Sequence, residues 1–115
     1  CFNPISTKKF LGEKISLVNG LGGKMVQELV KSKDIGEFQD KSIKFAKYIN
    51  VVTPKMEKVV SELRKNGIKC GVALFGETIF SLVPCSEKKK VLQILEKYDG
   101  FVLSSKIDNS GARLD

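Results

Sequence analysis

Two short segments of the chain carry residue types that could contact an anionic ligand. In the first, Gly71 and Ala73 fall on one face of an expected strand, and Gly76 lies at the turn that follows it. Small side chains on a strand let another group approach the backbone closely. That group is either a helix packed tightly across this face, which the residues alone favour, or a ligand such as a phosphate or a sugar-like acid lying against backbone N–H groups.

The second segment is Pro4-Ile5-Ser6-Thr7-Lys8, which offers two hydroxyls and an ammonium on an extended stretch. This trio suits hydrogen bonding to a carboxylate or a phosphate, and it equally suits an ordinary helix cap. The glycine-rich segment Asn19 to Lys24 does not fit a phosphate loop, because Val18 and Met25 stand where the Walker pattern needs Gly and Ser or Thr. A loosely packed or broken helix is the better interpretation there.

The composition excludes several kinds of chemistry. The 115 residues contain no His, which excludes Ser-His-Asp and Cys-His triads and His-containing zinc sites. Cys1, Cys70 and Cys85 form no Cys-x-x-Cys pair, and their odd number argues against a disulfide framework. We expect free thiols in a reducing cytoplasm, with Cys70 and Cys85 buried as small hydrophobic side chains. No pair of carboxylates stands out as an acid/base couple.

The chain is basic, since 20 Lys and Arg against 13 Asp and Glu give a formal net charge of +7. Only Arg64 and Arg113 are arginines, whereas bidentate recognition of bases favours Arg, and the lysines are spread along the whole chain. This pattern argues against a nucleic-acid partner and is consistent with a phosphorylated small molecule. No stretch is long and apolar enough to span a bilayer, so we expect no membrane partner.

Apolar spacing predicts helices in the first half of the chain. After an extended start over 1–11, a helical stripe covers 13–31, either as one helix weakened by glycines or as two pieces around a loop. A second stripe follows the break at 34–36. Thr53-Pro54 then provides an N-cap and a first helical residue, and Asn66-Gly67 is a typical helix end.

The second half changes to a strand pattern. Two apolar runs around Gly76-Glu77 are typical of a type II′ β-hairpin, with Phe75 opposite Thr78, and both faces of it are apolar enough to be buried. This register also sets Ala73 opposite Phe80 and Gly71 opposite Leu82. The remaining expected elements are a helix from Ser86-Glu87 to Tyr98 and a third strand from Phe101 to Ile107. The order predicts one α+β domain, a ferredoxin-like variant with helices packed on one face of an antiparallel sheet.

Three segments, in this order, resemble a known family. They are Pro4-Ile5-Ser6-Thr7-Lys8, the hairpin Ala73-Leu74-Phe75-Gly76-Glu77-Thr78-Ile79-Phe80, and Ile107-Asp108 followed by Gly111-Ala112-Arg113. Together they are similar to the C-terminal half of the archaeal pantoate kinase family, within the galactokinase/homoserine kinase/mevalonate kinase/phosphomevalonate kinase superfamily. The intervening helices have similar lengths and spacing, so the resemblance spans essentially the whole chain.

The resemblance implies ATP-dependent phosphorylation of pantoate to 4-phosphopantoate in coenzyme A biosynthesis. It implies that 1–115 is the C-terminal half of a two-domain kinase, inactive alone, whose N-terminal domain holds most of the contacts to ATP and Mg²⁺. The family's glycine-containing third motif corresponds to 70–76, although Lys69 and Gly71 stand where the family leads us to expect Gly and Ser. The expected substrate and phosphate cleft residues are Cys70, Gly71, Val72, Ala73, Gly76, Ser6, Thr7 and Lys8, with no catalytic residue and no metal ligand among them.

Other functions remain open from the sequence. The chain could be a non-catalytic α+β module that binds a small acid or a partner protein, and a basic nucleic-acid-binding domain is a weaker third interpretation. The oligomeric state is open, a homodimer included. The first residue is Cys rather than Met, which suggests that the chain begins inside a longer polypeptide or has been processed.

Overall fold

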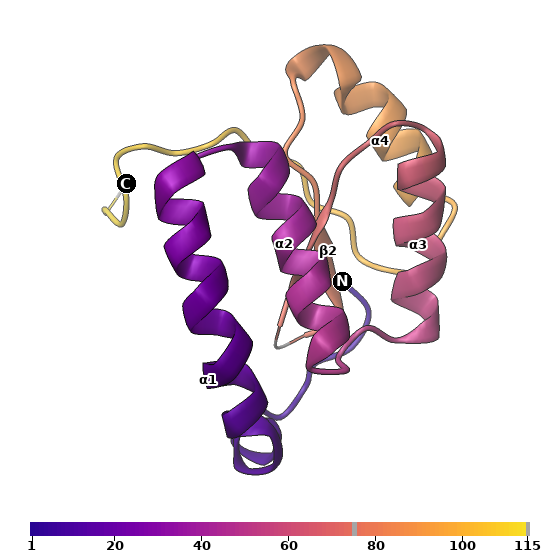
Figure 1. Ribbon diagram of the computed structural model, residues 1–115. Helices are drawn as coiled ribbons and strands as arrows, with labels where there is room; N and C mark the ends of the chain where they lie inside the picture. Colours follow the sequence, from indigo (N-terminus) through magenta and orange to yellow (C-terminus); the bar gives the residue numbers. More distant parts are fainter. Residues whose placement is uncertain (75, 115) are drawn as a thin grey trace.

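Four α-helices and a two-stranded β-hairpin make up the part of the chain that the computed structural model describes, residues 1–74 and 76–114 (Figure 1). The elements are α1 (Thr7–Ser32), α2 (Ile35–Tyr48), α3 (Pro54–Lys65), β1 (Gly71–Ala73), β2 (Thr78–Phe80), the single 3-10 turn η1 (Cys85–Glu87) and α4 (Lys88–Leu95). The expected α+β class is confirmed. Within the described residues, no helix combines the length and the apolar character needed to cross a membrane.

The first three helices begin where the sequence offers a capping side chain. Ser6, Asp34 and Thr53 each accept a hydrogen bond from the backbone N–H three residues later. Helix α3 ends at Asn66, and Gly67 follows with φ +72°, a left-handed conformation that favours glycine. The predicted caps at Ser6 and Thr53 and the predicted end at Asn66-Gly67 are therefore confirmed.

Helix α1 is one continuous helix of 26 residues, so the glycines at its centre do not break it. A Cβ on Gly20 or Gly23 would meet nothing within 4 Å, whereas Gly22 faces the Phe45 ring of α2 at 3.6 Å. The expected extended start is too long, because the Ser6 cap lets the helix begin at Thr7 instead of after residue 11.

Helix α2 lies against β1 and provides partners for backbone groups of the hairpin. The Ser42 hydroxyl donates to the Val72 carbonyl at 2.9 Å and accepts from the Val72 N–H at 3.0 Å. One turn earlier, the Gln39 side-chain carbonyl accepts from the Leu82 N–H at 2.8 Å. Antiparallel pairing leaves alternate backbone groups pointing away from the partner strand, so these side chains close an edge that would otherwise be open.

The hydrophobic core lies between α2, α3, β1 and α4. It includes four side chains from α3, among them Leu63, which is fully buried. Its buried members are Phe10, Ile43, Ala46, Ile49, Val51, Met56, Val59, Val60, Leu63, Ile68, Cys70, Val72, Val91 and Ile94. The short strands are thus held mainly by helices, because an isolated two-stranded hairpin is only marginally stable in water.

The hairpin register is shifted by two residues from the prediction. Gly71 lies opposite Phe80, Val72 opposite Ile79, and Ala73 opposite Thr78. The predicted partner of Thr78, Phe75, lies outside the described residues. β1 ends at Ala73 and β2 begins at Thr78, farther apart than a two-residue turn would place them. Before β2, Glu77 has φ +31° and contacts Asn3 of the N-terminal segment. The expected burial of both faces is also wrong, since Ala73 is exposed and β2 is only half-buried.

The expected third strand over 101–107 is absent from the structure. Cys1 and Phe101 form two reciprocal backbone hydrogen bonds of 3.0 Å, and pairing stops there. The next residue of the N-terminal segment, Phe2, donates its N–H to Glu77 instead, at 3.2 Å. With no strand edge left to pair with, the following chain stays exposed, and Leu103 is 79% accessible.

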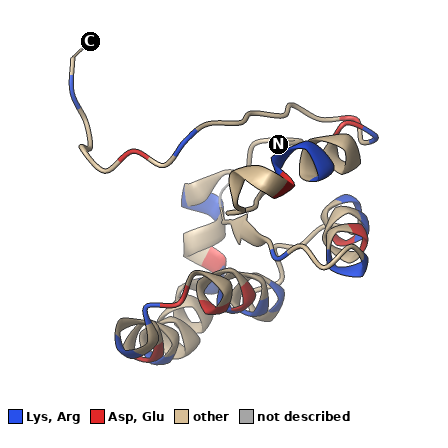
Figure 2. Ribbon diagram, turned by 90° about the horizontal axis from the view of Figure 1, so that it is seen from above, with Lys and Arg blue, Asp and Glu red and all other residues tan. Residues whose placement is uncertain are grey.

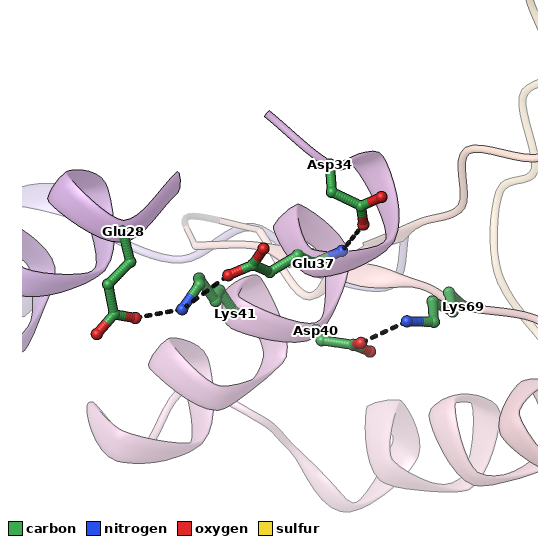
Figure 3. A network of polar contacts seen from close by, with 6 residues as sticks. All are labelled: Glu28, Asp34, Glu37, Asp40, Lys41 and Lys69. Carbon is green, nitrogen blue, oxygen red and sulfur yellow. Dashed lines mark hydrogen bonds and ion pairs between the residues drawn. The ribbon is translucent and has the colours of Figure 1, made fainter. Parts of the chain in front are cut away.

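An ion-pair network connects α1 to α2 and α2 to the chain that enters β1 (Figure 3). Lys41 contacts Glu28 of α1 and, at 3.3 Å, Glu37 of its own helix. Lys69 contacts Asp40 at 2.7 Å. The hydrogen bond and charge of Lys41 lower the pKa of Glu28, and the same hydrogen bond, donated to Glu28, raises the pKa of Lys41. The Lys41 side chain is only 17% accessible, whereas its two partners and the Lys69–Asp40 pair are open to water, so the network adds to the helix packing without replacing it.

Replacing Lys41 by Gln removes this pairing, so we expect a lower melting temperature than wild type near neutral pH. The lowered pKa of Glu28 makes its contribution present above pH 4.5 and lost as the pH falls through the folded-state value, so the difference shrinks in acid. Thermal melts followed by circular dichroism, one near neutral pH and one in acid below pH 4.5, test this. Lys89→Gln, at an exposed position of α4 and without an ion pair among the described residues, is the control. A pH-independent difference contradicts the electrostatic account.

Candidate functional site

Glu77, in the hairpin connection, joins three segments that are distant in the sequence. Its carboxylate accepts a hydrogen bond from Asn3 Nδ2 at 2.7 Å, and its carbonyl accepts from the Phe2 N–H. The Thr53 hydroxyl donates to the same carboxylate. The hydrogen bonds from Asn3 and Thr53, together with the nearby charge of Lys55, lower the pKa of Glu77. Glu77 is therefore an ionised carboxylate at neutral pH whose charge is taken up by its neighbours.

The end of the molecule around this junction is suited to an anion. Ser6, the N-cap of α1, follows Asn3 by three residues and so lies within about 10 Å of it. Thr53 is the N-cap of α3, and Figure 1 shows the starts of both helices and the hairpin connection toward the same end. Each helix start carries a partial positive charge, and Lys8 and Lys55 are exposed nearby. This end offers hydroxyls, ammonium groups and free backbone N–H groups.

Four of the eight residues expected in the cleft belong to this end. Ser6, Thr7 and Lys8 are exposed at the start of α1. Gly76 is half-buried beside the N-terminal segment, where a Cβ would lie 4.0 Å from the Asn3 carbonyl oxygen. The structure thus places the residue just before segment 4–8 against the hairpin connection that holds Gly76.

The other four expected residues lie along β1 and are mostly enclosed. Gly71 is covered by the Phe80 ring, whose Cε1 would be 2.8 Å from an added Cβ. Val72 has both backbone groups bonded to Ser42. Ala73 is exposed. In this arrangement the small residue at 71 accommodates an aromatic ring from the neighbouring strand, and the backbone beside it faces protein.

The cysteines are free thiols, as expected, but differ in environment. Cys70 is buried, as predicted, and burial raises its pKa to about 11, so it is a neutral thiol that packs in the core. The prediction for Cys85 is wrong, because this residue is exposed. The chain leaves the core at Pro84, and Cys85 opens η1 on the surface.

Sequence reasoning missed the polar side chains that hold the site in place. Gln39 and Ser42 had a usable signal, since they share a helical face with Ile43 and Ala46 and a polar residue among core positions requires a partner. Glu77 had none, because an acid next to glycine in a turn is common and its partner, Asn3, lies 74 residues away.

The described residues provide no preformed metal site. No group of three or more Cys, Asp or Glu side chains among them could hold an ion. Surface grooves lie along the outer faces of α3 and α4, and neither is lined by an expected cleft residue.

Segments 4–8 and 73–80 both resemble the kinase family, and the Asn3–Glu77 contact joins the residue immediately before the first segment to a residue of the second. No family model, curated protein or solved structure matches the chain. The third segment, 107–113, is exposed, and Figure 2 shows this terminal stretch running away from the helices. Figure 2 also shows basic residues on every helix, interleaved with acids on α1, α2 and α3. Membership of the kinase family stays a prediction.

Adding a methyl group at position 71 tests the close contact with Phe80. We expect Gly71→Ala to destabilise the protein by about 1–3 kcal/mol in urea unfolding, because the ring must move away. Gly20→Ala, in open space on α1, is the matched control and should stabilise by up to about 1 kcal/mol. In a Phe80→Leu background the loss should be smaller; an equal loss in both backgrounds contradicts the contact.

Removing the Ser42 hydroxyl tests the link between α2 and β1. Ser42→Ala leaves the Val72 N–H and carbonyl without partners, so we expect a loss of about 1–3 kcal/mol. Amide hydrogen exchange at Val72 should also accelerate. Ser16→Ala, at an exposed position of α1, is the control and should change neither quantity. Unchanged exchange at Val72 in the Ser42 variant would show that the helix does not protect this strand.

Proposed function

We propose that the chain is the C-terminal, substrate-cleft domain of an ATP-dependent kinase that phosphorylates pantoate to 4-phosphopantoate in cytoplasmic coenzyme A biosynthesis. Its fold in this proposal is a reduced ferredoxin-like variant of the kinase superfamily domain. The observation that carries the proposal is the 2.7 Å contact between Asn3 and Glu77, because it holds the residue just before segment 4–8 against the hairpin, the most specific segment of the resemblance. A basic end with two helix starts supports an anionic substrate there.

The residues at this end have distinct roles in the proposal. The exposed Ser6 and Thr7 side chains and the first free N–H groups of α1 bind the carboxylate of the acid, and Lys8 contributes charge. Ser6 also caps α1, so its oxygen must be shared with the Lys9 N–H. Glu77 acts as a positioning residue that holds the N-terminal segment against the hairpin. The small Gly76 leaves room for a bound molecule to approach the connection.

ATP and Mg²⁺ are placed mainly on an N-terminal domain in this proposal. Phosphoryl transfer depends on positioning and on charge stabilisation around the transferred group. The described residues of this chain provide cations and hydroxyls for the acid and no carboxylate cluster for a metal. We therefore expect the chain alone to bind the acid and to release no ADP.

Calorimetry with pantoate and an ADP-release assay test the proposal. We expect the 115-residue chain to bind pantoate with a dissociation constant near the millimolar range or tighter, about −4 kcal/mol or better. The Lys8→Gln variant should bind several-fold more weakly, and Lys31→Gln, at the exposed far end of α1, should bind as wild type does.

The polypeptide encoded by the full reading frame should release ADP only when both ATP and pantoate are present. ADP release by the 115-residue chain alone contradicts its role as an incomplete half of the enzyme. Pantoate binding without ADP release by the full polypeptide favours the non-catalytic acid-binding module. Absence of pantoate binding by both polypeptides removes the proposal.

A further inference from the structure

The outer face of α3 forms one wall of a shallow groove of about 570 Å³. Tyr98, three residues beyond the end of α4, forms the opposite wall. This volume lies within the range of small-molecule sites, about 300–1,000 Å³. The groove contains none of the residues of the proposed pantoate site, so a ligand here would add a second binding function.

The two acids in the groove, Glu57 and Glu62, each form an ion pair with a lysine that lies outside the groove. Glu57 forms an ion pair with Lys47 of α2 at 3.0 Å. Glu62 forms an ion pair with Lys97 at 2.8 Å and accepts a hydrogen bond from the Tyr98 hydroxyl. These contacts occupy both carboxylates and fix the orientation of the tyrosine ring, so neither acid opposes the entry of an anion into the groove.

The two lysines in the groove have no such partner. Neither Lys58 nor Lys65 forms an ion pair within residues 1–74 and 76–114. They are seven residues apart on α3, about 10 Å along the helix axis, with Ser61 between them on the same face. Two long ammonium side chains and a hydroxyl can therefore converge on one group, and the groove has a surplus of two positive charges.

We propose that this groove binds a small phosphomonoester with an apolar or aromatic body. The phosphate lies between Lys58, Ser61 and Lys65, and the body lies against the Tyr98 ring and Pro54. A phosphomonoester carries a charge close to −2 at neutral pH, which matches the surplus of the groove, and lysine is a common phosphate ligand. The aromatic wall favours an ester with a ring over inorganic phosphate.

Titration with phenyl phosphate, followed by amide chemical shifts and calorimetry at low salt, tests the inference. We expect shift changes centred on Ser61 and Tyr98, and weaker binding of inorganic phosphate. The double variant Lys58→Gln/Lys65→Gln should bind phenyl phosphate at least about 10-fold more weakly, which corresponds to about 1.4 kcal/mol. Tyr98→Phe keeps the ring and should retain more affinity than Tyr98→Leu.

The matched control is Lys31→Gln/Lys106→Gln, which removes the same charge at exposed positions outside the groove. Retained binding in this control supports the site. Equal loss in both double variants shows only general attraction to a basic protein and overturns the inference, as does an absence of shift changes in the groove. Pantoate binding is tested in a separate titration with the Lys8→Gln variant. The pantoate proposal and the phosphomonoester proposal can therefore each fail without affecting the test of the other.

Discussion

The Ser42 hydroxyl, bonded to both backbone groups of Val72, is the contact on which the rest of the structure depends. Each strand of the hairpin is only three residues long and could not persist alone in water. Helix α2 supplies what a neighbouring strand would supply elsewhere, with Gln39 adding a second bond to Leu82. Because these polar side chains lie beside Ile43 and Ala46, one helical face both buries apolar area and satisfies the sheet.

Once α2 holds β1, the hairpin connection has a defined place at one end of the molecule. Glu77 can then accept hydrogen bonds from Asn3 and Thr53 and so join the N-terminal segment to the start of α3. A carboxylate removed from water requires such partners, and here they come from the starts of two different helical regions. The buried Glu77 carboxylate needs hydrogen-bond donors, and the segments that provide them, around Asn3 and Thr53, are those that form the candidate anion site.

The prediction of the site from sequence succeeded in part, for reasons that specific residues make clear. The Asn3–Glu77 contact ties the chain just before Ser6, Thr7 and Lys8 to the connection that holds Gly76, and nothing local to either segment indicates this contact. Gly71 was correctly identified as a position of close approach. The approaching group is the Phe80 ring, set there by a register that differs by two residues from the one the turn sequence suggested.

The sequence by itself determined which segments are helical and both ends of α3, because a cap such as Thr53 with Met56, or Gly67 after Asn66, involves residues at most a few positions apart. It also determined the basic charge and the absence of histidine chemistry. Only the tertiary structure decided the strand register, the loss of the third strand and the gathering of the site. Those features depend on contacts across 30 to 100 residues, as between Ser42 and Val72 or Cys1 and Phe101, which no local pattern encodes.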